Sequence, residues 1–195
     1  MSYSRLPAFV LGFHGCDRAL AKRVVCIRQH LKPSENEYDW LGHGIYFWEN
    51  NPVRAMGWAK EQSLRARRKG KRFEPAVIGA VIDLGKCLDL LNAASIELVE
   101  RAYDYLKRVR KKENVPLPSN KNLSGSTDYL MRNLDCAVIN SLHEMIAHED
   151  PFDSVRAAFL EGQPIYLNAG FRRKSHIQIC VRNPSNIKGY FHPFD

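Results

Sequence analysis

The segment that most constrains the fold is a run in which two glycines precede aromatic, β-prone residues and a helix start follows at once. It reads Trp40-Leu-Gly-His-Gly-Ile-Tyr-Phe-Trp48, and Asn50-Asn-Pro52 comes next. Aromatic and β-branched residues favour an extended strand, whereas proline in the first turn favours a helix start. The chain is therefore predicted to pass from a strand directly into a helix at this point.

The other predicted elements alternate irregularly along the chain. Strands are expected at Pro7 to Phe13, Ala76 to Leu84, Val155 to Leu160, Ile165 to Leu167, His176 to Arg182 and Ile187 to Phe191. Helices are expected from a cap at Asp17 to Leu31, from Pro52 to near Gly70, over Ala94 to Lys111 and over Thr127 to His148. Because strands and helices do not alternate strictly, the sequence predicts an α+β fold. Its 195 residues, 45% of them hydrophobic, suffice for a single domain over residues 1–195.

The chain is basic, and its positive charge is concentrated in two places. Lys and Arg number 29 against 21 Asp and Glu. Most of the excess lies at Arg65 to Arg72 and at Arg101 to Lys112, which close two of the predicted helices. The candidate phosphate-binding residues are Arg65, Arg67, Arg68, Arg108, Arg110 and Lys111. Such clusters attract nucleic acid, and a solvated helix face is the alternative interpretation.

Cysteine usage and hydropathy favour a cytoplasmic protein. The five cysteines are odd in number and widely spaced, as expected for reduced, mostly buried thiols. No apolar run approaches the length of a membrane span, and no secretion signal is recognisable. His143 and His148 stand five residues apart and point to different sides of a helix, so we expect them at the surface or rim, and we expect no metal. The glycine patterns of the dinucleotide fingerprint and of the phosphate loop are also absent.

Three short blocks carry a family resemblance. They are His14-Gly15 at the end of the first strand, Gly42-His-Gly44-Ile-Tyr46-Phe47, and a late strand His176-Ile-Gln178 followed by Asn183-Pro-Ser185. Their order and spacing resemble the ADP-ribosyltransferases of the diphtheria-toxin and poly(ADP-ribose) polymerase branch, including bacterial relatives that act as toxins or phage-defence effectors. The resemblance spans Phe9 to Phe191, but the stretch Asp89 to Asp150 has no counterpart in it.

The resemblance implies two packed, mainly antiparallel sheets with an NAD-binding cleft. In the family, the residue equivalent to His14 hydrogen-bonds a ribose hydroxyl of NAD, and the backbone at Gly15 holds the nicotinamide amide. Tyr46 would stack on the nicotinamide ring, with Gly44 and Phe47 completing the set of cofactor-binding residues. Taken singly, His14 and Tyr46 also fit ordinary core positions.

Gln178 is where the chain departs from the family pattern, which commonly has glutamate there. A neutral amide orients a ribose hydroxyl but does not stabilise positive charge as a carboxylate does. Three interpretations remain open: transfer with Gln178 itself, substitution by a nearby carboxylate, or NAD binding without turnover. Glu161 is the best candidate for a carboxylate that replaces the family's glutamate. The alternative is that Glu161 is an ordinary solvated residue in a turn. His176 shares a strand face with Gln178 and either assists or is paired at the rim.

The resulting prediction is an enzyme that transfers a single ADP-ribose from NAD to a macromolecule, with Gln178, Glu161 and Tyr46 as its catalytic candidates. The basic clusters favour nucleic acid over protein as acceptor, and an antitoxin protein is a conceivable partner. Two alternatives belong to other classes. One is a catalytically weak module that binds NAD or ADP-ribose, and the other is a nucleic-acid-binding domain without an NAD site.

Overall fold

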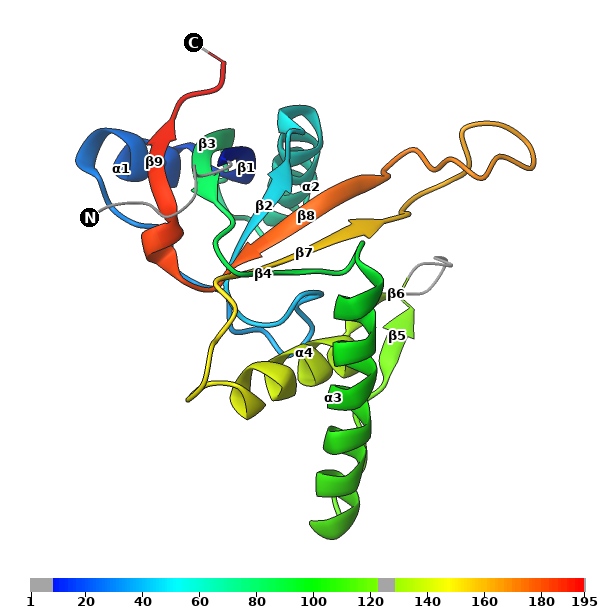
Figure 1. Ribbon diagram of the computed structural model, residues 1–195. Helices are drawn as coiled ribbons and strands as arrows, with labels where there is room; N and C mark the ends of the chain where they lie inside the picture. The colour runs from blue at the N-terminus through cyan, green and yellow to red at the C-terminus, as the bar shows by residue number, and fades with distance from the viewer. Residues whose placement is uncertain (1–8, 123–128, 195) are drawn as a thin grey trace.

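The computed structural model describes residues 9–122 and 129–194, and this part of the chain is built on one seven-stranded sheet (Figure 1). The strand order is β4-β7-β8-β2-β1-β3-β9, and a separate pair, β5-β6, forms a second sheet. All pairings are antiparallel except that of β4 with β7. The strands are β1 (Phe9–Asp17), β2 (Ile45–Glu49), β3 (Pro75–Asp83), β4 (Cys87–Asp89), β5 (Asn120–Asn122), β6 (Tyr129–Arg132), β7 (Ser154–Phe159), β8 (His176–Val181) and β9 (Ile187–Phe191). The helices are α1 (Arg18–Ile27), α2 (Pro52–Arg68), α3 (Ala93–Lys112) and α4 (Asn133–Met145), with a 3₁₀ turn, η1, at Pro184–Asn186.

Helix starts follow the capping residues that the sequence offers. The side chain of Asp17 accepts a hydrogen bond from the backbone N–H of Ala19, and that of Asn51 accepts one from Arg54. Such caps satisfy N–H groups that have no partner within the helix. The predicted starts of α1 and α2 are thereby confirmed, and α2 follows β2 directly.

The sheet separates into two halves between β1 and β2. These strands pair only at Gly12–Glu49 and Phe13–Trp48. Beyond this point β1 continues its pairing with β3 as far as Asp17, while β2 continues with β8 from Trp48 to Ile45. The residue at which the two halves part is His14.

Each face of the sheet has its own core. Successive strand residues point to opposite faces, and β2 shows this directly. Ile45 and Phe47 pack in a cluster with α1, whereas Tyr46 packs in one with α3 and α4. Trp48 joins a smaller cluster with α2. Figure 1 shows α3 and α4 on the side of the sheet away from α1 and β9.

Several expectations are corrected by the structure. The α+β class is confirmed, but the described residues hold one large sheet and a two-stranded one rather than two large packed sheets, because the β1–β2 pairing joins the halves. Of the predicted helix over Thr127 to His148, residues 127–128 lie outside the described residues. The chain from Tyr129 to Met145 is β6 followed by α4, since pairing with β5 overrides helical periodicity. Ile165 to Leu167 is not a strand but part of an exposed loop.

His143 is also placed differently from the prediction. It is buried rather than at the surface or rim, with 5% of its area exposed, and its ring contacts Phe152 edge-on. The buried residues of α4 cover more than one stripe of the helix, because neighbouring elements pack on several of its sides. His148 is exposed, as expected.

Candidate functional site

Three adjacent strands, in the order β8-β2-β1, carry the three sequence blocks. Trp48 of β2 pairs with Gln178 of β8, and Tyr46 pairs with Cys180. His14 of β1 donates a hydrogen bond from Nδ1 to the backbone oxygen of Tyr46, 2.8 Å away. Blocks that are far apart in the sequence therefore meet at the point where the sheet halves separate.

The first of two polar groups in this region, called here the motif cluster, consists of His14, Tyr46 and the loop residues Leu41 and Gly42. The Tyr46 hydroxyl donates to the backbone oxygen of Gly42 at 2.6 Å and accepts from the N–H of Leu41 at 2.8 Å. Gly42 has φ +76°, a conformation that glycine adopts without strain. Burial raises the pKa of Tyr46 and lowers that of His14, so both are neutral near pH 7.

The structure places His14 and Tyr46 side by side but directed to different faces. The His14 ring lies against the Phe47 ring, with 5.9 Å between centroids, on the α1 side of β2. Tyr46 and Gln178 face the other side, together with Trp48. A ligand that contacts both His14 and Gln178 would therefore have to lie where β1 and β2 part.

Three of the expected cofactor-binding residues have packing roles. Phe47 is fully buried, so we assign it to the core and not to the candidate site. A Cβ at Gly15 would lie 2.3 Å from the backbone oxygen of Ala55, so glycine allows α2 to pack on β1. At Gly44 a Cβ would meet Cys180 Sγ at 2.5 Å. These glycines bring backbones together within the protein.

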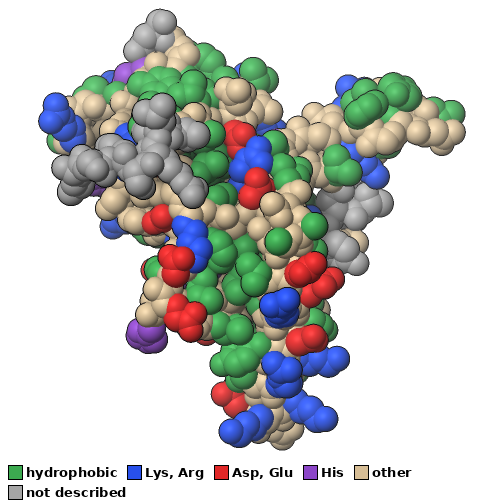
Figure 2. Space-filling model, in the orientation of Figure 1, with side chains coloured by type: hydrophobic (Ala, Val, Ile, Leu, Met, Phe, Trp, Pro, Cys, Tyr) green, Lys and Arg blue, Asp and Glu red, His purple; other side chains and the backbone are tan. Residues whose placement is uncertain are grey.

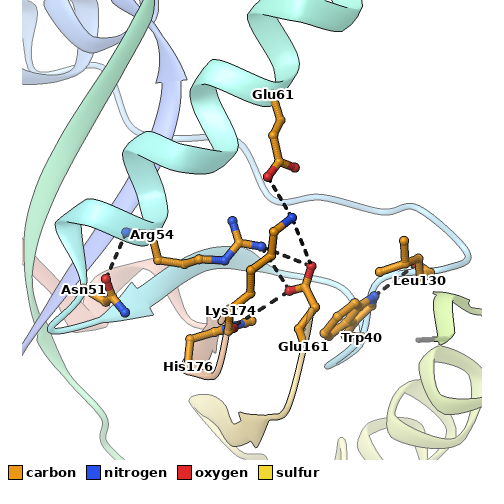
Figure 3. Close-up of polar contacts among 8 residues, drawn as sticks. All are labelled: Trp40, Asn51, Arg54, Glu61, Leu130, Glu161, Lys174 and His176. Atoms are coloured by element: carbon orange, nitrogen blue, oxygen red, sulfur yellow. Dashed lines mark hydrogen bonds and ion pairs between the residues drawn. The ribbon is translucent and has the colours of Figure 1, made fainter. Parts of the chain in front are cut away.

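A second polar group, the hairpin cluster, lies at the base of the β7–β8 hairpin and consists of Trp48, Arg54, Glu161, Lys174 and His176. Figure 3 shows all of these residues except Trp48. Arg54 donates from Nη2 to both carboxylate oxygens of Glu161, at 3.2 and 3.0 Å. Lys174 Nζ is 3.9 Å from Glu161 and 2.9 Å from Glu61 of α2. The pair Arg54–Glu161 is largely buried, with side chains 11% and 13% exposed.

His176 is enclosed by aromatic rings within this cluster. The ring centroids of Phe159, Trp48 and Trp40 lie 5.6, 6.3 and 6.4 Å from that of His176. Its Nδ1 donates to the backbone oxygen of Lys174 at 2.6 Å and lies 3.9 Å from Glu161. Because burial lowers its pKa, the ring is neutral, and Nε2 then carries a free lone pair.

The hairpin cluster contains three buried polar atoms without a hydrogen-bond partner among the described residues. They are Trp48 Nε1, Arg54 Nε and His176 Nε2. Buried polar groups are nearly always hydrogen-bonded, so an orphaned one calls for a ligand or water. Gln178 lies next to them: it pairs with Trp48, is half-buried, and its side chain makes no hydrogen bond within the described chain.

Arg54 and Lys174 were missed by the sequence analysis, and Trp48 was treated only as part of a strand. One signal for Arg54 was available. Positive charge is unfavourable in the first turn of a helix because of the helix dipole, and Arg54 occupies that turn of α2. A carboxylate beside an arginine in that turn offsets the unfavourable dipole interaction, and Glu161 supplies one from 107 residues away. The pairing itself depends on the tertiary fold.

The two basic groups do not form one surface. Arg65, Arg67 and Arg68 end α2, whereas Arg110 and Lys111 end α3. Figure 1 shows the C-terminal end of α3 projecting away from the sheet, far from α2. Basic residues in a last helical turn are stabilised by the helix dipole, which is sufficient reason for their position.

Three further features of the described residues concern metal ligands, membrane-spanning helices and cysteines. No group of three or more potential metal ligands occurs within residues 9–122 and 129–194. In the same part of the chain no helix has the length and apolarity of a membrane span. Cys16, Cys136 and Cys180 are buried free thiols, as predicted, whereas Cys26 is exposed.

Comparisons with known proteins identify a relative without assigning a function. The chain is 25% identical over 203 residues to the uncharacterized protein MJ0359 of Methanocaldococcus jannaschii, an alignment covering 96% of this chain and 87% of that protein. No family model and no solved structure matches the chain. The candidate site therefore stands on its own geometry.

Proposed function

We propose that this protein transfers a single ADP-ribose group from NAD to a macromolecular acceptor. The observation that carries the proposal is the adjacency of β8, β2 and β1, which brings Gln178, Tyr46 and His14 together where the sheet halves part. The three residues come from separate parts of the chain: Tyr46 follows His14 by 32 residues, and Gln178 follows Tyr46 by more than 100.

The side chains of the hairpin cluster fit the chemistry of NAD. Arg54 Nε is a cationic donor suited to a phosphate oxygen, and Trp48 Nε1 is a second donor. Gln178 and the lone pair of His176 Nε2 are acceptors for ribose hydroxyls. NAD, when bound, supplies the glycosidic bond between nicotinamide and ribose, which breaks as the acceptor bonds to the ribose carbon.

His176 and Glu161 take separate roles in this proposal. His176 Nε2 accepts the proton that the acceptor group loses, because its Nδ1 proton is held by Lys174 and its ring is neutral near pH 7. Glu161 is held by Arg54 and lies 3.9 Å from His176 Nδ1, where its charge stabilises the protonated ring. A carboxylate at Glu161 thereby compensates for the neutral Gln178.

The test is to incubate the purified protein with labelled NAD and a cell extract, then to digest separate portions with ribonuclease, deoxyribonuclease or protease. We expect label in the macromolecular fraction, released by one digestion, which identifies the acceptor class. Absence of label with NAD binding detected by calorimetry supports the alternative, a binding module whose neutral Gln178 explains the lack of turnover. Absence of both contradicts any NAD site.

Substitution of Gln178 by Glu sharpens this test. A carboxylate beside the reacting ribose should change the transfer rate by about tenfold or more, because charge stabilisation is a large term in such reactions. The matched control is Gln29→Glu, an exposed position near the end of α1. An unchanged rate in Gln178→Glu would show that this residue does not face the reacting atoms.

A further inference from the structure

A cleft separate from the three motif-bearing strands opens between α3, the start of α4 and the end of β7. Its volume is about 840 Å³. The walls are mainly apolar, and several of the side chains are exposed, including Leu91, Ile96 and Leu160. A cleft of this size, lined by apolar side chains left open to water, has the dimensions of a binding site.

One side of this cleft is a free strand edge. β4 covers β7 only at Ser154–Arg156. Leu90 N–H bonds the oxygen of Arg156, and Arg182 N–H bonds that of Asp153 on the opposite side. Since backbone groups in a strand alternate in direction, the N–H and C=O of Ala158 point outward. The described residues provide no hydrogen-bond partner for them.

The rim of the cleft is acidic although the chain has a net charge of +8. Glu100 and Asp104 line it from α3, are exposed, and form no ion pair within the described chain. Asp135 and Arg132 also line the cleft and form an ion pair with each other, which leaves Glu100 and Asp104 as the excess negative charge among its lining residues. Figure 2 shows acidic side chains on the upper part of α3 and basic ones at its lower end. The cleft therefore attracts positive charge.

We propose that this cleft binds an extended segment of a partner protein. The segment adds as a strand along Ala158, places an apolar side chain in the cleft, and directs a lysine or arginine toward Glu100 and Asp104. Strand addition to an open edge obtains its affinity from backbone hydrogen bonds and its specificity from pockets for alternate side chains. A small organic cation would leave the Ala158 backbone groups without partners, which is why a peptide fits better.

Trp40, Leu41 and Phe159 line the cleft and also contact the candidate site. The proposal does not rest on the NAD chemistry, because the residues it uses, Ala158, Glu100 and Asp104, take no part in that chemistry. The test is selection of peptides from a displayed random library on the wild-type protein, with counter-selection on Ala158→Pro. Proline removes the outward N–H, and edge strands tolerate it, so the variant should fold normally by circular dichroism. We expect enriched peptides that alternate apolar and other residues and contain Lys or Arg.

An enriched peptide is then synthesised and its binding measured by fluorescence anisotropy. We expect about tenfold weaker binding to Ala158→Pro and to Asp104→Lys, and weaker binding at higher salt. Ala93→Pro, at the first residue of α3, is the matched control and should bind normally, because proline is favoured there.

Two results would overturn the proposal. One is the absence of enrichment, or enriched peptides that bind Ala158→Pro as tightly as the wild type. The other is a dimer in sedimentation experiments that Ala158→Pro dissociates, which would assign the strand edge to a second copy of this chain.

Discussion

The motif cluster and the hairpin cluster lie on neighbouring strands and differ in how far their polar groups are satisfied. In the motif cluster the Tyr46 hydroxyl has two partners and His14 Nδ1 has one. In the hairpin cluster Trp48, Arg54 and His176 each have a buried polar atom without a partner among the described residues. The first arrangement fastens strands and loop together, whereas the second leaves hydrogen-bonding capacity for a ligand.

The residues singled out by the sequence motifs are therefore not the ones whose polar atoms are free to bind a ligand. Tyr46 has its hydroxyl committed to the glycine loop, so any contribution to a ligand comes from its ring. The hairpin cluster concentrates charge and orphaned atoms around His176 and Glu161. Substitutions that remove single groups from each cluster test this contrast.

Removal of Arg54 should have the largest effect on stability. Arg54→Ala removes the hydrogen-bonded partner of the largely buried Glu161 carboxylate and leaves only Lys174, 3.9 Å away, as a nearby cation, which costs about 3–5 kcal/mol of the free energy of unfolding. Urea denaturation measures this loss, with the exposed Arg67→Ala as control at less than about 0.5 kcal/mol. A loss no larger than that of the control would mean that the hairpin cluster is solvated and not a preformed site.

Tyr46→Phe should cost less, because it removes one hydroxyl and no charge. The N–H of Leu41 and the oxygen of Gly42 then lose a partner, at a combined cost of about 2–3 kcal/mol. Tyr38→Phe, at an exposed tyrosine, is the control. NAD binding should survive in Tyr46→Phe, measured at a temperature where the variant is folded. If binding is lost instead, the hydroxyl acts on the ligand and the motif cluster is more than a framework.

Acid should destabilise the protein through its buried histidines. Burial lowers the pKa of His14, His143 and His176 in the folded state, that of His143 to about 3. The unfolded chain therefore binds more protons, and stability falls as the pH drops below about 6.5, the unfolded value. For His143 the loss between pH 6.5 and pH 5 is about 2 kcal/mol. Urea denaturation at both pH values should show a smaller loss in His143→Phe, and an unchanged loss would place the acid sensitivity elsewhere.

Substitution of His143 is expected to change stability the least. It also tests whether a buried polar atom without a hydrogen-bond partner marks a ligand site by itself. Both of its ring nitrogens are buried without a partner among the described residues, and the charge of Arg182 adds to burial in lowering its pKa. His143→Phe should therefore stabilise the protein at pH 7 by about 1 kcal/mol and leave any NAD binding unchanged. A loss of binding in His143→Phe, relative to His148→Phe, would show that isolated orphaned atoms also mark the site.

Local chemistry in the sequence predicted much of the fold. Asp17 and Asn51 predicted helix starts, since a cap acts on N–H groups only two or three residues away. The run of β3 predicted a strand, because buried strands are recognisable from continuous apolar residues. The exceptions are β6, where a helix was predicted, and the burial of His143. They depend on strand pairing with β5 and on packing against Phe152, which helical periodicity does not encode.

By itself the sequence determined the α+β class, the three blocks around His14, Tyr46 and Gln178, and the buried thiols. These properties depend on residue type and short-range spacing. Only the tertiary structure decided that the blocks lie on adjacent strands, that His14 and Tyr46 face different sides, and that Arg54 meets Glu161 beside His176. These contacts join residues that are 32 positions apart for His14 and Tyr46 and 107 apart for Arg54 and Glu161. Their geometry follows from strand order and burial, which no local pattern encodes.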